Sequence, residues 1–123
     1  MNEINFQSIF DKLQDLLPNA WDEIVFYAAY SSGSYSMKYY IKTGSEIIDC
    51  YSQSDVSRMQ LIKAFMSIDK ELAPVRKTLP PTEAWNVITM IVDCHGNMKT
   101  HFDYTDVSEN MIEYTRAWEE KYL

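Results

Sequence analysis

Residues of the types that bind metal ions cluster in one stretch of the last third of the chain: Asp93, Cys94, His95, His101 and Asp103. Zinc sites usually place their ligands in closely paired spacings such as CxxC or HxxxH. Neither spacing occurs in the sequence. His95 falls in a tight turn, whereas His101 lies along the strand that we expect to follow it. We therefore expect no metal site, and we expect His101 to be a surface residue of that strand.

The same stretch also contains residue types that act in catalysis, but their spacing does not indicate that they meet at one site. Cys94 and the histidine after it would point to opposite faces of a strand, which disfavours a hydrogen-bonded nucleophile and base. Paired carboxylates could come from Asp103, Asp106 and Glu109, which serve equally well as helix caps and a solvated rim. The sequence contains no GxGxxG, GKS or GKT signature for phosphate binding. We expect no enzyme and no cofactor; the alternative is an enzyme that uses the face of His101 and Asp103.

The charge of the chain restricts the partners that it could bind. The formal net charge is −7. Residues 1–52 carry 7 acids and 3 bases and residues 83–123 carry 8 acids and 3 bases, whereas residues 53–82 carry 3 acids and 5 bases. Nucleic acid and anionic membranes repel an acidic domain, so we expect no direct binding to either. A basic protein is the complementary partner, although acidity alone also keeps a protein soluble.

The start of the chain and its cysteines bear on its compartment. The first residues, MNEINF, have no basic flank, and polar residues follow them, unlike a secretory signal. No apolar run approaches the roughly 20 residues that cross a bilayer. Cys50 and Cys94 lack CxxC spacing, and without an export signal we expect two buried free thiols. The expected compartment is the cytoplasm.

Hydrophobic periodicity predicts three helices. Apolar residues recur near a 3.6-residue period over residues 4–17, until a proline ends the run. Ser52, three residues before Asp55, has the spacing of a capping box and opens a second expected helix that ends near Pro74. The side chains of this helix that we expect to face inward are Val56, Met59, Ile62, Phe65, Met66, Ile68 and Leu72. A closing helix repeats through Met111, Thr115, Trp118 and Tyr122, with Asp106 or Ser108 as its cap.

Strand patterns fill the intervals between these helices. WDEIVFYAAY and YSMKYYIK flank a Gly-bearing loop and predict a hairpin, and SEIIDCY is a third expected strand. AWNVITMIVD and NMKTHFDY flank CHGN and predict a second hairpin, in which His101 and Asp103 share one face with Lys99. The order α-β-β-β-α-β-β-α predicts a single α+β domain over residues 1–123. An antiparallel sheet of about five strands would have the helices packed on it.

Several motifs together resemble a known family. FDYTDVSE (residues 102–109) and RAWEEKYL (residues 116–123) resemble the C-terminal signature of the YezG-like immunity (antitoxin) proteins of bacteria. LLPNAWDEIVFYA (residues 16–28) resembles the Pro-x-x-Trp entry into the family's first strand. SYSMKYYIK (residues 34–42) is similar to its second strand, and Trp85 stands where a Trp usually opens the fourth. The resemblance therefore covers nearly the whole chain.

The resemblance implies a bacterial cytoplasmic protein that binds and neutralises the toxin domain of a cognate secreted polymorphic toxin. Such toxins are typically of the LXG or type VII-exported kind and are often nucleases. The family brings no catalytic residues with it. This chain departs from the family pattern at Glu120, where an aromatic residue is common, and in NMIEYT, which lacks the usual Pro. Partner specificity is where we expect such departures to act.

The resemblance directs attention to exposed acids and aromatic residues, because carboxylates can imitate a phosphate backbone and rings can supply affinity. The candidate partner-binding residues are Asp103, Asp106, Glu109, Glu113 and Tyr114, together with Tyr35 and Tyr40 of the second expected strand. Asp106 is equally suited to capping a helix, and Tyr40 to packing in the core. The alternative to toxin binding is an adaptor or homodimer in which the aromatic strands pair with a second copy.

Overall fold

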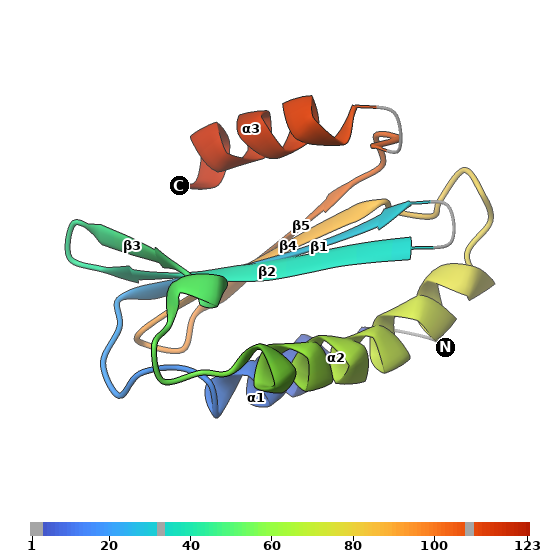
Figure 1. Cartoon of the computed structure of the whole chain (residues 1–123). Coiled ribbons are helices and arrows are strands. Elements are labelled where there is room, and N and C mark those ends of the chain that lie inside the picture. The colour runs from blue at the N-terminus through green and yellow to red at the C-terminus, as the bar shows by residue number, and fades with distance from the viewer. Residues whose placement is uncertain (1–3, 32–33, 108–109) are drawn as a thin grey trace.

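The computed structural model describes residues 4–31, 34–107 and 110–123, and its central element is strand β1 (Glu23–Ser31) (Figure 1). The seven residues between the ends of β1 are all buried. These residues are mostly β-branched or aromatic, which suits a strand covered on both faces. The strand therefore requires a packed layer above it and another below it.

The sheet has five strands in the order β3-β2-β1-β4-β5, and each neighbouring pair is antiparallel. Both predicted hairpins are confirmed, and Gly96 at φ +87° provides the turn of the second, a backbone conformation that favours glycine. The α+β class and the predicted element order are also confirmed. The other strands are β2 (Ser34–Thr43), β3 (Glu46–Asp49), β4 (Val87–Asp93) and β5 (Met98–Asp103).

Helices cover both faces of the sheet (Figure 1). α1 (Phe6–Gln14) and α2 (Arg58–Thr78) lie on one face, and α3 (Met111–Tyr122) lies alone on the other. A short 3₁₀ helix, η1 (Cys50–Ser52), follows β3. Alternation along β1 divides the core: Ile24 and Phe26 pack toward α1 and α2, whereas Tyr27 packs toward α3.

The ends of α2 differ from the predicted ones. Ser57, not Ser52, caps the helix, and its hydroxyl and the side chain of Gln60 form a reciprocal capping box. The helix also continues past Pro74, although proline removes one backbone hydrogen bond. Contacts beyond the proline explain this: the Arg76 guanidinium donates to the Trp85 carbonyl and to Asn86 Oδ1, each at 2.7 Å. These bonds fix the last turn against the start of β4.

The inward face of α2 is narrower than predicted. Phe65, Ile68 and Leu72 are buried as expected, and Val56 is partly buried against the same core. Met59, Ile62 and Met66, which were expected to face inward, are instead exposed. The reason is that α2 rests on the sheet with α1 along only one of its flanks. The opposite flank has no neighbouring helix in the described chain (Figure 1).

The two cysteines lie in different environments. Both are free thiols, as predicted. Cys50 is buried in η1, but Cys94 is exposed, so the expectation of two buried thiols was wrong. Cys94 stands one residue beyond β4, in the turn where the strand has left the sheet. The sequence around it is apolar only on the strand side of that turn.

Candidate functional site

The candidate site lies where β5 and α3 face each other. His101 and Asp103 project from the same face of β5, as predicted, opposite Thr89 and Val87 of β4. α3 covers this face of the sheet and leaves a groove of about 480 Å³ beside β5. The groove is lined by Thr89, Thr100, His101, Phe102, Asp103, Tyr114, Ala117, Trp118, Lys121 and Tyr122. Aromatic rings and one carboxylate therefore share a single hollow.

Asp103 is the carboxylate held in this groove. It accepts hydrogen bonds from the Thr105 N–H at 2.8 Å and from the Tyr114 hydroxyl at 2.8 Å. Partial burial acts to raise the pKa of Asp103, but these bonds and the nearby Lys121 ammonium outweigh it and leave the pKa below its ordinary value. Burial and the Asp103 charge together raise the pKa of Tyr114. At neutral pH the groove therefore contains an ionised carboxylate and a neutral phenol.

Trp118 holds α3 on the sheet and forms the floor of the groove. It is the buried residue of α3, at 4% exposure. Its indole N–H donates to the Thr89 hydroxyl at 2.8 Å, and its ring packs against Tyr27, Tyr40 and Tyr122. The floor of the groove is therefore a buried, hydrogen-bonded side chain of α3.

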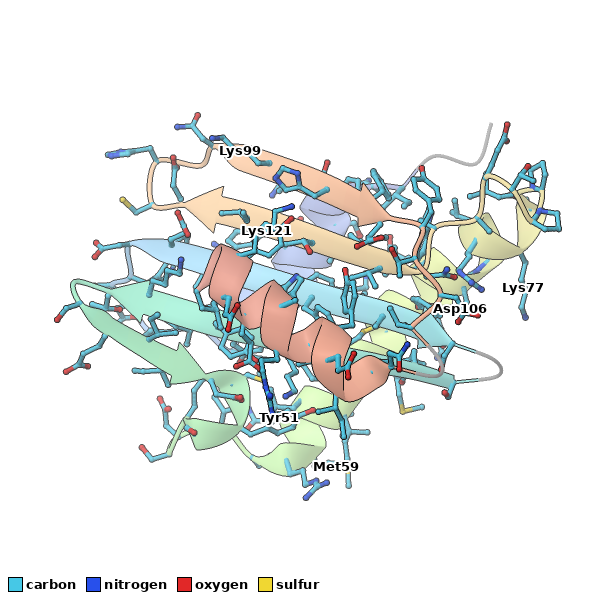
Figure 2. All side chains as sticks on the ribbon, turned by 90° about the horizontal axis from the view of Figure 1, so that it is seen from above. Tyr51, Met59, Lys77, Lys99, Asp106 and Lys121 are labelled. Carbon is cyan, nitrogen blue, oxygen red and sulfur yellow. The ribbon has the colours of Figure 1, made fainter. Side chains whose placement is uncertain are left out.

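The remaining acidic candidates do not line the groove or fall outside the described residues. Asp106 is exposed in the connection from β5 to α3 (Figure 2). Glu113 is exposed in the first turn of α3, where the helix dipole favours a negative charge. Glu109, and Ser108 as an expected cap, lie outside the described residues. The structure therefore brings Asp103 and Tyr114 into contact and places Asp106 and Glu113 near the same end of α3.

The two candidate tyrosines of β2, Tyr35 and Tyr40, are not part of the groove surface. Tyr40 is buried beneath α3 against Trp118, and burial raises its pKa to about 12. Tyr35 is exposed, but it lies on the opposite face of the sheet, beside Tyr30. Sequence reasoning missed Thr89 and Lys121 as groove residues. No sequence pattern identified them, because they reach the groove only when β4 and α3 are packed together.

The groove combines aromatic rings, a histidine and a lysine with one carboxylate. His101 packs against Tyr122, with ring centroids 5.8 Å apart. The described hydrogen bonds to Asp103 come from the Tyr114 hydroxyl and the Thr105 amide, not from His101. Asp93 uses its oxygens to accept from the turn residues His95 and Asn97. Among the described residues there is no group of three side chains placed to hold a metal ion. Rings beside a carboxylate provide both cation–π and charge-assisted contacts.

The fold is of the α+β class, with a groove between α3 and β5. More particularly, the chain belongs to the YezG-like immunity protein family, whose sequence profile matches residues 1–123. The immunity protein YezG of Bacillus subtilis (strain 168) is 26% identical over 128 residues, covering 96% of this chain and 85% of that protein. This membership confirms the resemblance seen in the motifs and supports an immunity role. In the described part of the chain, no helix is long and apolar enough to cross a membrane.

Proposed function

We propose that this protein binds and neutralises the nuclease domain of a cognate secreted toxin in the bacterial cytoplasm, by direct contact and without turnover. Family membership supports the immunity role. The observation that carries the nuclease assignment is the ionised Asp103 in an aromatic groove on a chain of net charge −7. Nucleases bind a polyanion through basic surfaces, so an acidic partner can occupy the same surface.

The groove receives an arginine or lysine side chain of the toxin. The cation meets the Asp103 carboxylate, and the rings of Tyr114 and Tyr122 provide π faces beside it. Lys121 also lines the groove, with its ammonium 5.3 Å from the Tyr122 ring centroid and close enough to lower the Asp103 pKa. We therefore expect Lys121 to compete with the cation of the toxin for the Asp103 carboxylate.

The acids outside the groove lining act at longer range. Asp106 and Glu113 are exposed, so water and salt screen their interaction with a partner. Their role is to steer a basic surface toward the groove and to raise the association rate. Asp103, which is partly buried and hydrogen-bonded, contributes more to the lifetime of the complex.

The test first captures the partner from a lysate of the producing bacterium with this protein as bait, and then measures binding to the captured toxin domain by calorimetry at low and high salt. Asp106→Lys and Glu113→Lys are each expected to weaken the complex about two- to fivefold, as exposed ion pairs do. Asp103→Asn is expected to weaken it about thirtyfold, because a desolvated cation then loses its charged partner. The matched control for the two lysine variants is Glu83→Lys, which makes the same charge change on an exposed residue beside α1 and α2, outside the groove lining.

Each result has a defined meaning. Absence of a complex, or nuclease activity that persists in a stoichiometric mixture, refutes the proposed function. A complex that the three groove variants weaken no more than Glu83→Lys refutes the acidic groove as the site while leaving the immunity role in place. Activity of the isolated protein that disappears in His101→Ala would support the enzyme alternative.

A further inference from the structure

One flank of α2 is uncovered and carries a row of apolar side chains. Met59, Ile62 and Met66 are 60%, 42% and 50% exposed. Their spacing of three and four residues places them in one row along the helix, here called the apolar row. On the other flank, Glu71 forms an ion pair with Lys12 of α1, so α1 occupies that side. The apolar row therefore faces away from α1, where the described chain places no neighbouring helix (Figure 1).

A row of lysines runs beside the apolar row. Lys63, Lys70 and Lys77 recur every seven residues, which is close to two helical turns, so they lie on one side of α2. In heptad terms the apolar row occupies the a and d positions and the lysines occupy the e positions. All three lysines are exposed. Within the described part of the chain, none of them forms an ion pair.

The charge on the exposed surface of α2 differs from that of the chain as a whole. The chain has a net charge of −7, yet α2 exposes Arg58 and the three lysines and no acid. The two acids of α2 are partly buried and already bonded, Glu71 to α1 and Asp69 to the Tyr30 hydroxyl at 2.7 Å. No acid stands three or four residues from any of the three lysines, which is the spacing of ion pairs within a helix. The lysines therefore lack a counter-charge on α2.

The same flank opens into a hollow toward the end of α2. The hollow has a volume of about 340 Å³ and lies between α2 and the β1–β2 hairpin. Its walls include Ala73 and Lys77 of α2 and Tyr35 of β2, which is 38% exposed. Ala73 follows Met66 by seven residues, so the hollow continues the line of the apolar row. Met59 and Lys77 mark the two ends of this surface in Figure 2.

We propose that this flank of α2 binds an acidic amphipathic helix of a partner protein, which lies alongside α2. The apolar side chains of the partner helix pack on the apolar row and enter the hollow, and its carboxylates face the three lysines. Helices recognise each other in this way when apolar a and d positions are bordered by opposite charges. Methionine suits the role because its flexible side chain adapts to the surface that it meets. The site lies on the sheet face opposite α3, so it is separate from the groove beside β5 (Figure 1).

The described elements of a second copy of this chain do not offer such a helix. α1 is already packed against α2, and the exposed surface of α2 is itself basic. α3 exposes several acids, but Ile112 is the one large apolar side chain that it exposes. Arg116 follows Ile112 by one turn and would meet the lysines with a like charge. The partner helix is therefore assigned to another protein.

An anionic membrane would also attract lysines that stand beside apolar side chains. The rest of the chain opposes this partner, because the segments before and after residues 53–82 are both acidic. The largest apolar side chains of α2, Phe65, Ile68 and Leu72, are also buried on the sheet and cannot enter a membrane. A helix of a partner protein meets the lysines without bringing the acidic segments against a charged plane.

The test uses a synthetic peptide of about three heptads, with leucine at the a and d positions and glutamate at the e and g positions. Fluorescence anisotropy of the labelled peptide measures its binding to the full chain. We expect a dissociation constant on the order of 10 µM, which rises as salt is added. A twin peptide with lysine in place of glutamate is expected to bind at least about tenfold more weakly.

Two variants locate the binding on α2. Lys70→Glu reverses a charge in the middle of the lysine row and should weaken binding of the glutamate peptide about fivefold. Its matched control is Lys99→Glu, the same change at an exposed position on β5. Ile62→Ser removes an exposed apolar side chain and should weaken binding at least about fivefold. Its matched control is Ile112→Ser, at a 77% exposed position on α3.

Several results would overturn the proposal. These are no binding of the glutamate peptide, equal binding of the two peptides, and variants on α2 that weaken binding no more than their controls do. Sedimentation velocity and co-sedimentation with vesicles containing about one third phosphatidylserine examine the other occupants. Self-association or vesicle binding that Ile62→Ser abolishes would assign the flank to a second copy or to a membrane instead. Calorimetry with the toxin domain examines the groove separately, so failure of one proposal is distinguishable from failure of the other.

Discussion

Replacing Trp118 with alanine is predicted to release α3 from the sheet while leaving the rest of the fold in place. The loss of a buried aromatic side chain costs about 3–5 kcal/mol. The Thr89 hydroxyl, which is buried and accepts from the indole, would lose its partner at a further cost of about 1–3 kcal/mol. α3 would still be held by the Tyr114–Asp103 bond, by the Lys42 ammonium on the Tyr122 carbonyl at 2.7 Å and by partly buried side chains such as Met111. We expect these partly exposed contacts to offset only part of the loss.

The release should be local because the two cores are separate. Trp118 belongs to the smaller cluster under α3, whereas Phe65, Ile68 and Leu72 of α2 pack in the larger one on the opposite face. Hydrogen exchange measured residue by residue is the assay, since it distinguishes local from global opening. In Trp118→Ala we expect the amides of α3 to exchange faster, by a factor that corresponds to a decrease of at least about 3 kcal/mol in the free energy of opening. The amides of α2 should be much less affected.

Two further variants make this prediction specific. Thr89→Val keeps the shape of the side chain but removes the acceptor of the indole N–H, and it should cost about 1–3 kcal/mol by itself. Ile112→Ala, at an exposed position in α3, should change exchange very little. Two results would refute the view that Trp118 anchors the helix. One is a decrease of less than about 1 kcal/mol in the free energy of opening α3 in Trp118→Ala. The other is an equal increase in amide exchange rate in α2 and α3.

The remaining predictions concern charge and accessibility. The pKa of Asp103 is lower in the folded protein than its ordinary value of 3.8. Its contribution to stability is therefore present above that ordinary value and is lost as the pH falls through the folded value. Acid titration of wild type and Tyr114→Phe should show a smaller acid-dependent loss of stability in the variant. Lys121→Gln removes the competing cation and should tighten the toxin complex, whereas weaker binding in calorimetry would contradict the proposed role of the groove. A thiol reagent should label Cys94 quickly and Cys50 only on unfolding. Cys94 is exposed, whereas Cys50 is buried and burial raises its pKa to about 12. Equal labelling of the two thiols in the native protein, measured by mass spectrometry, would contradict this prediction.

Sequence patterns predicted which segments form helices and strands. They failed to predict the exposure of a side chain where that exposure depends on how neighbouring elements pack. The alternation along β5 placed His101 and Asp103 on one face, because strand geometry alone decides that relation. The apolar period of α2 was read correctly as helical, but it could not show that Met59 and Met66 lie on the uncovered flank. That depends on where α1 packs, which is a tertiary relation.

The candidate site shows the same division. The sequence could identify Asp103 and Tyr114 as an acid and a ring near the last junction, yet their hydrogen bond depends on how α3 docks. Docking in turn depends on Trp118 finding Thr89, which is 29 residues away in sequence and on another element. Tyr40 was ambiguous for a comparable reason, since only the position of α3 decides whether it is covered.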